Sequence, residues 1–367
     1  MSTPTLVEAG LDSQIAAAVR ARYAERRDRA ARYGATFLRL WDLASEHAEG
    51  GKLVRPALLV RAHRAMSATT GASHVDDDAL VSLAASLELL HFAFLLHDDV
   101  IDGDLYRRGR PNLVGTLLTE RRAVDEDPSA PAGLHWGQTG AILAGNLVLS
   151  QVHQTFARAA VPGAVRERLL DLLDEAITDT IAGEHADVAL SDGVLEPDLD
   201  TILSTAARKT ATYSFALPLR LAAVLADAPE AWDGPLETIG RHLGLAFQLQ
   251  DDYLSTFGNA ALHGKDRWSD LREGKQTAII AFARMTSRWP AVREHLGDRA
   301  LSDTDAERVV TELRACGADR FVAGLVEEHL AAISTLLASA DAPGHALPAG
   351  LRVLLHELTT GLTGRRA

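Results

Sequence analysis

Two acidic clusters are the residues of this sequence best suited to chemistry. Asp98, Asp99 and Asp102 form the pattern DDxxD after a long apolar run, and Asp251 and Asp252 form a second pair. Carboxylates grouped in this way repel one another unless a cation lies among them. A hard divalent ion such as Mg²⁺ accepts one or two carboxylates together with water and phosphate oxygens. The clusters therefore indicate metal-dependent binding of a phosphorylated substrate.

In a helix, Asp98 and Asp102 share one face because they are four residues apart. Phe94, His91 and Leu87 precede Asp98 by four, seven and eleven residues and belong to the same stripe. We expect this stripe to line a cavity below the metal ions. A solvated acidic helix end would show the same DDxxD pattern, but the preceding apolar run favours function. By itself, His91 is more typical of a core residue.

Basic segments that could bind a diphosphate lie on both sides of the first acidic cluster. Gly50-Gly51-Lys52-Leu53-Val54-Arg55-Pro56 precedes it, and Arg107-Arg108-Gly109-Arg110-Pro111 follows it. Arginine offers a planar fork of donors and lysine a compact charge, and both bind phosphate oxygens. Each segment alone is equally typical of a basic surface turn. After the second acidic pair come Lys265, Asp270 and Lys275.

The elements that must position these residues are helices. Helical spacing recurs, as in Leu169, Leu170, Leu172, Leu173 and Ile177, whereas sustained alternation of period two is scarce. We expect an all-α fold with one domain over residues 1–367, a single large helical bundle around a central cavity, and flexible ends at 1–12 and 362–367. The expected breaks are Gly50-Gly51, Asp125 to Gly137, Ser191 to Asp198, Thr256 to Lys275 and Ala340 to Gly350.

Composition and charge exclude several classes of protein. The sequence is 47% hydrophobic, which predicts a packed core. A formal net charge of -13 argues against a broad surface for nucleic acid or anionic lipid. The single cysteine, Cys316, excludes an internal disulfide, and the first residues lack the pattern of a signal peptide. We therefore expect a cytoplasmic protein.

The apolar run from Leu80 to Leu96 approaches the length of a membrane span. Glu88 and His91 lie inside it, and His97-Asp98-Asp99 follows where an interfacial anchor would be expected. A buried helix at the centre of a bundle fits these residues better. We therefore expect no stable membrane insertion.

Taken in order from Gly50 to Lys275, these motifs resemble the trans-isoprenyl diphosphate synthases, also called polyprenyl synthetases. The resemblance implies the isoprenoid synthase type of helical fold and a prenyltransferase activity that joins isopentenyl diphosphate to an allylic diphosphate. It assigns isopentenyl diphosphate binding to Lys52, Arg55, His91 and Arg108. It assigns contacts with the allylic diphosphate to Arg107, Lys209, Thr210, Gln248 and Lys265.

The same resemblance implies three Mg²⁺ ions. Two of them would bind Asp98 and Asp102 and the third Asp251, with Asp99 and Asp252 as supporting carboxylates. The ions would favour departure of pyrophosphate from the allylic substrate, whose cation is then attacked by the double bond of isopentenyl diphosphate. The catalytic residues implied in this way are Asp98, Asp99, Asp102, Arg107, Lys209, Asp251 and Lys265.

Two positions depart from the family pattern. Ser255 stands where the second aspartate motif usually ends in Asp, and Asn146 stands where the Asp of a Gly-Asp pair is common. The segment from Asp251 to Asn259 also resembles a degenerate metal motif of class I terpene cyclases, which share the fold. A cyclase needs no second diphosphate pocket, so the four residues assigned to isopentenyl diphosphate favour condensation. A non-catalytic subunit of a heteromeric synthase would be expected to lose such residues.

Product length depends on the residues just before DDxxD. In the family, bulky side chains at the positions of Ala93 and Phe94 shorten the product and small ones lengthen it. One aromatic and one small residue indicate an intermediate length, with the twenty-carbon geranylgeranyl diphosphate favoured over the fifteen-carbon farnesyl diphosphate. Members of the family are usually homodimers, which we expect here as well.

Overall fold

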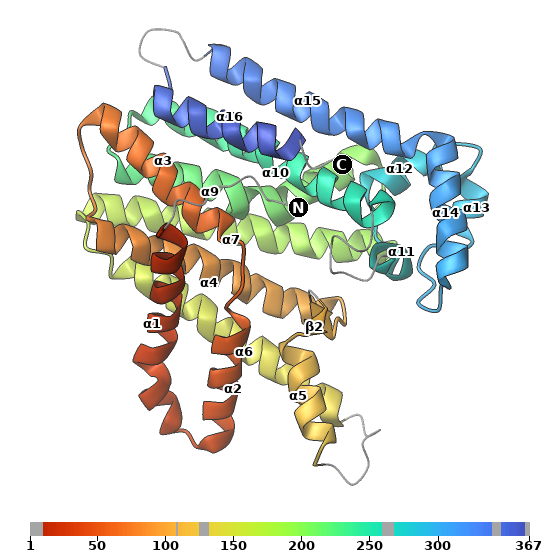
Figure 1. Cartoon of the computed structure of the whole chain (residues 1–367), viewed down its shortest axis with the longest axis horizontal. Helices are drawn as coiled ribbons and strands as arrows, with labels where there is room; N and C mark the ends of the chain where they lie inside the picture. The colour runs from red at the N-terminus through yellow and green to blue at the C-terminus, as the bar shows by residue number, and fades with distance from the viewer. Residues whose placement is uncertain (1–9, 108, 125–131, 259–267, 340–345, 364–367) are drawn as a thin grey trace. The chain divides into compact units, whose positions relative to one another are not determined.

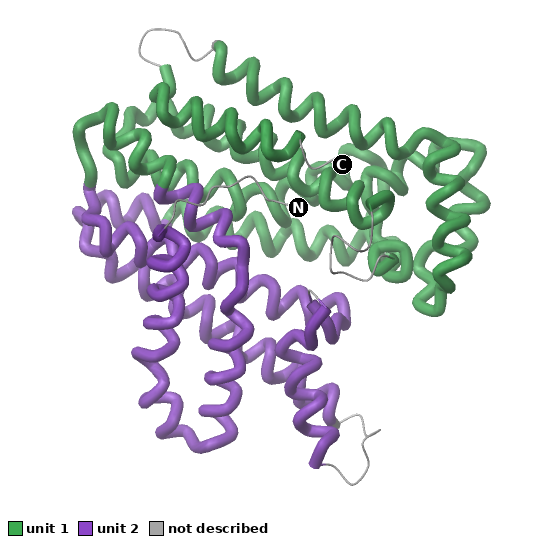
Figure 2. The backbone as a smooth tube through the Cα atoms, in the orientation of Figure 1, with its two compact units in different colours: residues 1–5, 61–73, 171–367 green, residues 6–60, 74–170 purple. Residues whose placement is uncertain are grey.

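The structure is a computed structural model that describes residues 10–107, 109–124, 132–258, 268–339 and 346–363. The chain divides into two compact units, which Figure 2 colours differently. The C-terminal unit comprises the described parts of residues 61–73 and 171–367, and the N-terminal unit those of 6–60 and 74–170. Helices form nearly all the regular structure described in both units, which confirms the all-α prediction. The expectation of one domain stays a prediction.

The N-terminal unit is built around two long helices, α4 and α6 (Figure 1). Its elements are α1 (Leu11–Ala31), α2 (Ala35–His47), α4 (Asp77–Ile101), β1 (Tyr106–Arg107), β2 (Arg110–Pro111), α5 (Leu113–Arg122) and α6 (Ala132–Ala157). The two short strands pair antiparallel and form the sole sheet within the described residues. Two further helices cross the boundary between the units: α3 (Val54–Thr70) and α7 (Gly163–Ser191).

The C-terminal unit contains the remaining helices (Figure 1). In chain order they are α8 (Leu199–Ala206), η1 (Ala207–Ala216), α9 (Leu217–Leu225), η2 (Glu230–Trp232), α10 (Asp233–Phe257), α11 (Ser269–Glu273), α12 (Ala278–Arg284), α13 (Trp289–Arg293), α14 (Asp303–Cys316), α15 (Ala318–Ser339) and α16 (Ala349–Thr363). The segment η1 is a π-helix that continues directly from α8 into α9. Such segments are rare and occur frequently at functional sites.

Helix α4 contains the whole apolar run from Leu80 to Leu96. It begins where the side chain of Asp76 accepts a hydrogen bond from the backbone N–H of Ala79 at 2.8 Å, as an N-cap should. Two described helices, α4 and α15, are long and apolar enough to cross a membrane by length and composition. In α4, 67% of the apolar window is buried inside the protein, against 22% in α15. The burial of α4 agrees with the buried helix that we predicted.

Glycines let the neighbours of α6 approach it closely. A methyl group on Gly137 would lie 2.6 Å from the carbonyl oxygen of Val114 in α5, and one on Gly145 would meet the imidazole of His97 in α4. These distances are shorter than van der Waals contact, so only glycine fits. The end of α4 is thereby packed directly on α6, one residue before Asp98.

The start of α10 is fixed by ion pairs of the buried Arg220. Arg220 of α9 donates through Nε and Nη2 to both carboxylate oxygens of Asp233 at 2.8 and 2.9 Å, and through Nη1 to Glu175 at 2.8 Å. Two parallel donors of this kind define geometry as well as energy. The helix that carries the second acidic pair therefore begins at a defined point.

Two of the five predicted breaks agree with the observed helix boundaries, and those at Thr256 to Lys275 and Ala340 to Gly350 lie partly outside the described residues. The chain leaves helix between α2 and α3 at Gly50-Gly51 and between α7 and α8 at Ser191 to Asp198. The break predicted for Asp125 to Gly137 extends too far, because α6 already begins at Ala132. Gly133 and Gly137 lie inside that helix, where packing rather than chain reversal requires a small residue.

The π-helix η1 and α10 pack so closely that a side chain on α10 is excluded at two positions. A methyl group on Gly240 would overlap the backbone of Ala216, and one on Gly244 would overlap Cα and Cβ of Ala211. We predict that Gly244→Ala lowers the free energy of unfolding by about 1–3 kcal/mol, because the backbone of Ala211 cannot rotate away. Urea unfolding followed by circular dichroism measures this effect.

Gly234→Ala is the matched control on the same helix. A methyl group at Gly234 has no atom within 4 Å, and replacing glycine by alanine in a helix favours folding by up to ~1 kcal/mol. The control should therefore be neutral or slightly stabilising. Equal stability of the Gly244→Ala protein and the wild type would show that η1 and α10 are not in such close contact.

Candidate active site

The first acidic cluster lies on the last turn of α4, in the N-terminal unit. Asp102 caps the helix, and its backbone N–H donates to the carbonyl of Asp98 at 2.8 Å. Asp98 and Asp102 each offer a carboxylate oxygen, and these oxygens lie within 4.8 Å of each other. Both residues are half-buried, as are His91 and Phe94 on the same stripe. The predicted stripe is thus present on α4, with Leu87 fully buried at its far end.

Arg107 binds two carboxylates of this cluster at once. From β1, its Nη2 donates to Oδ2 of Asp98 at 3.0 Å, and its Nε and Nη2 donate to Oδ1 of Asp99 at 3.0 and 2.6 Å. Burial raises the pKa of Asp99 to about 6, although the charge of Arg107 opposes the shift. Asp99 is buried and accepts two of the three hydrogen bonds that Arg107 donates to the cluster, so it is a supporting carboxylate. Asp98, although also bound by Arg107, and Asp102 are the more accessible carboxylates.

Asn112 joins the hairpin to the helix that follows it. Its Nδ2 donates to the carbonyl of Asp104 at 2.8 Å, and its Oδ1 accepts from the backbone N–H of Gly115 at 2.9 Å. The second bond caps α5. The loop that carries Arg107 is thus tied to α5 as well as to α4. Arg108 lies outside the described residues.

The predicted phosphate-binding segment forms the turn between α2 and α3. Gly50 has a φ of 87° and Leu53 a φ of 50°, so two residues of this turn are left-handed. Lys52 is exposed and Arg55 is half-buried in the first turn of α3. Both residues belong to the same unit as His91.

The second acidic pair lies on α10, in the C-terminal unit. Thr210 of η1 donates through Oγ1 to Oε1 of Gln248 at 3.1 Å, and Nε2 of Gln248 donates to Oδ1 of Asp252 at 2.8 Å. Burial, with a smaller effect of Asp270, raises the pKa of Asp252 to about 7. The predicted residues Thr210 and Gln248 are therefore in contact, and they hold the inner carboxylate of the pair.

Lys209 is bound by two carboxylates that the sequence analysis missed. Its Nζ lies 3.0 Å from Glu184 and 2.7 Å from Asp187, both on α7. A methyl group on Gly183 would overlap the backbone of Lys209, so α7 and η1 are in direct contact there. The spacing of Glu184 and Asp187 on one helical face was the signal available in the sequence.

The remaining predicted residues include Lys265 and Ser255. Lys265 lies outside the described residues, so its assignment stays a prediction. Ser255 follows Asp251 by four residues on α10 and is half-buried. The roles assigned to all the site residues by resemblance also stay predictions.

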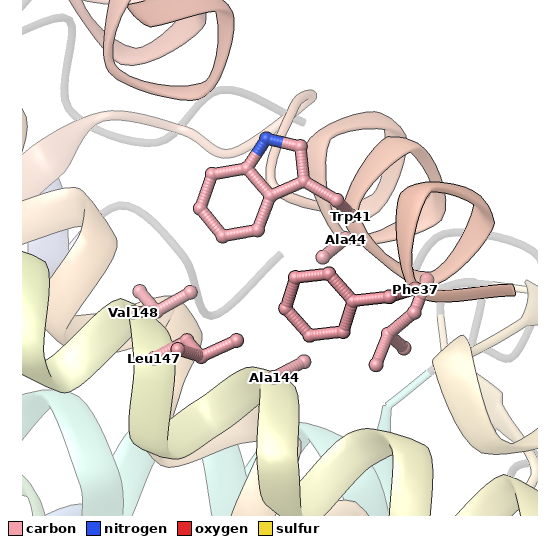
Figure 3. Close-up of a pocket in the computed structure, with 7 residues that line it drawn as sticks. Phe37, Trp41, Ala44, Ala144, Leu147 and Val148 are labelled. Atoms are coloured by element: carbon pink, nitrogen blue, oxygen red, sulfur yellow. The ribbon is translucent and has the colours of Figure 1, made fainter. Parts of the chain in front are cut away.

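A small pocket elsewhere in the N-terminal unit is unsuited to a diphosphate. Side chains of α2 and α6 form it (Figure 3), namely Phe37, Leu40, Trp41, Ala44, Ala144, Leu147 and Val148. None of them carries a charge. The one polar group, the indole N–H of Trp41, donates to the carbonyl of Tyr23 at 3.0 Å. The candidate active site is therefore defined by the motif residues and not by this pocket.

We predict that Lys209→Met lowers the free energy of unfolding by about 2–4 kcal/mol, because it leaves two largely buried carboxylates without their cation. Lys209, Glu184 and Asp187 each keep less than a fifth of the side chain exposed. Adding Asp187→Asn should recover part of the loss. Urea unfolding at neutral pH measures both variants.

Arg288→Met serves as the control, because the pair of Arg288 with Glu312 is exposed and contributes up to ~1 kcal/mol. A Lys209→Met protein no less stable than Arg288→Met would contradict a stabilising role for the ion pairs of Lys209.

Comparisons with known proteins agree with this arrangement. A profile described as polyprenyl synthetase matches residues 40–313. A (2E,6E)-farnesyl diphosphate synthase of Mycobacterium tuberculosis is 33% identical over 280 residues, which cover 74% of this chain and 68% of that protein. A geranylgeranyl diphosphate synthase of the same organism is 30% identical over 303 residues, covering 80% of this chain and 77% of that protein.

A solved structure supports the same conclusion over the full length. The geranylgeranyl pyrophosphate synthase of Corynebacterium glutamicum, complexed with isoprenyl diphosphate and magnesium, superposes with a TM-score of 0.87 at 26% identity. The match covers 100% of both chains. With the match of the family profile over most of the sequence, these similarities establish that the chain belongs to the polyprenyl synthetase family.

Proposed function

We propose that this chain is a Mg²⁺-dependent short-chain trans-prenyltransferase that joins isopentenyl diphosphate to an allylic diphosphate and releases pyrophosphate. The observation that carries the proposal is the last turn of α4. There Asp98 and Asp102 present carboxylate oxygens close together, and Arg107 binds the carboxylates of Asp98 and Asp99. This arrangement combines metal ligands with a cation suited to phosphate in one place.

The donor set fits Mg²⁺. Asp98 and Asp102 supply hard, half-buried oxygen ligands one helical turn apart, which is the chemistry that Mg²⁺ prefers. On α10, Asp251 is half-buried and precedes Asp252, whose raised pKa reflects burial. When bound, Mg²⁺ would neutralise the negative charge that develops on the departing pyrophosphate. We assign two ions to Asp98 and Asp102 and one to Asp251.

The remaining assigned residues would bind and orient the two substrates. Lys52, Arg55, His91 and Arg108 would hold isopentenyl diphosphate. Arg107, Lys209, Thr210, Gln248 and Lys265 would face the allylic diphosphate. In the structure Arg107 and Lys209 are each fixed by two carboxylates, so their ammonium or guanidinium groups are preorganised.

The product we propose is geranylgeranyl diphosphate. Phe94 is half-buried one turn before Asp98 on the inferred cavity stripe, whereas Ala93 is fully buried in the core. The ring of Phe94 would limit the growing chain at an intermediate length. We further propose a cytoplasmic homodimer without a membrane-spanning helix. The burial of α4 supports the last point.

The metal mechanism is tested with Asp98→Ala and Asp251→Ala. Each variant should lower turnover of isopentenyl and allylic diphosphates by at least about 100-fold, because each removes a ligand that stabilises the transition state. A chelator should abolish turnover of the wild type. Helix content, measured by circular dichroism, should stay unchanged. Full turnover of Asp98→Ala, or of the wild type without divalent ions, would disprove the mechanism.

Product length is tested with Phe94→Ala, which should shift the products to longer chains while catalysis is retained. The control is Phe92→Leu, because Phe92 is buried on the opposite side of α4 and should not contact the growing chain. Ala93→Phe is a poor test of shortening, since a ring at this fully buried position would overpack the core. Chromatography of the dephosphorylated products measures the distribution, and an unchanged distribution in Phe94→Ala would place the stopping residue elsewhere.

A further inference from the structure

Glu88 is a buried carboxylate in the middle of α4, with 6% of its surface exposed. Its side chain reaches the turn between α2 and α3. A methyl group added to Gly51 would overlap Oε1 of Glu88 and lie 3.2 Å from its carboxyl carbon. The carboxylate therefore lies directly against Cα of Gly51. Burial of a carboxylate is costly unless contacts within the fold compensate for it.

The turn that Glu88 contacts is held in a strained conformation. Leu53, with a φ of 50°, is one of two non-glycine residues with positive φ among those described. A leucine in this region costs about 1–3 kcal/mol and persists only when its surroundings determine the backbone. The carbonyl of Leu53 accepts the backbone N–H of Ala57 at 3.0 Å, so the strained residue also starts α3.

The contact with Glu88 provides such a determinant. Gly51 directly precedes Lys52, and Arg55 lies in the first turn of α3. On the other side, His91 follows Glu88 by three residues on α4 and so lies near it along the helix. One buried side chain thus connects the helix that carries His91 with the turn that carries the two basic residues.

We propose that Glu88 is a positioning residue for isopentenyl diphosphate. Its carboxylate, seated on Gly51, fixes the turn from Gly50 to Leu53 and so the directions of Lys52 and Arg55. Glu88 itself does not touch the substrate. The inference rests on the proposed function and adds a residue that the motif does not include. A displacement of about 1 Å in such a turn is enough to weaken binding strongly.

The test compares Michaelis constants for the two substrates in the full-length protein. Glu88→Ala should raise KM for isopentenyl diphosphate at least about tenfold and change KM for the allylic diphosphate by less than about twofold. Glu88→Gln, which keeps the shape of the side chain, should have a KM for isopentenyl diphosphate between those of the wild type and Glu88→Ala. Equal changes in both KM values, or none, would overturn the proposal, because a purely structural residue lowers only the amount of folded enzyme.

A double-mutant cycle tests the contact itself. Gly51→Ala should raise KM for isopentenyl diphosphate by displacing the carboxylate, and it should have much less effect in the Glu88→Ala background, where nothing remains to be displaced. If the fold changes in this KM of the two single variants multiply in the double variant, the two residues act independently, which would contradict the proposed contact. If Glu88→Ala fails to fold, Gly51→Ala and Glu88→Gln decide the question through the same pair of KM values.

The control is Ser86→Ala in the same helix. Ser86 is buried, and its Oγ donates to the carbonyl of Leu83 at 2.6 Å, away from the turn. Its KM values should stay within about twofold of wild type. If the wild-type enzyme does not elongate any allylic diphosphate, the proposed function is wrong. In that case calorimetric Kd values for isopentenyl diphosphate decide the role of Glu88, and equal Kd values in wild type and Glu88→Ala reject it.

Discussion

Carboxylates in a largely buried environment must be paired with cations, and this requirement determines the arrangement of the acidic residues in each unit. Arg107 binds Asp98 and Asp99, and Lys209 binds Glu184 and Asp187. Without these cations, the like charges would repel one another at low dielectric. The hairpin that carries Arg107 and the π-helix that carries Lys209 are thus the elements on which the acidic groups depend.

Close backbone packing gives these charges their positions. At Gly145 and Gly244 the missing side chain lets a neighbouring helix approach, and at Gly51 it makes room for a buried carboxylate. A methyl group at any of these positions would move a group that carries or supports the chemistry. The precision of the site therefore depends as much on absent side chains as on the charged ones.

The sequence predicted what depends on local pattern. Helical periodicity and the DDxxD spacing correctly predicted an all-α chain and a buried α4 that ends in carboxylates. The sequence did not predict the π-helix. Nor did it predict the contacts of Lys209 with Glu184 and Asp187, 25 and 22 positions earlier, because such pairings depend on how helices pack. From the sequence, Glu88 argues only against a membrane span. Its contact with Gly51 joins segments far apart in the sequence, which no local pattern reveals.

The central claim is that this chain performs a condensation, and product analysis tests it most directly. Purified protein is incubated with Mg²⁺, isopentenyl diphosphate and, in turn, dimethylallyl, geranyl or farnesyl diphosphate, and all products are identified by mass spectrometry. The account predicts longer prenyl diphosphates and released pyrophosphate, with chains that accumulate at twenty carbons. Cyclic hydrocarbons formed without consumption of isopentenyl diphosphate, or no turnover of any primer, would contradict it.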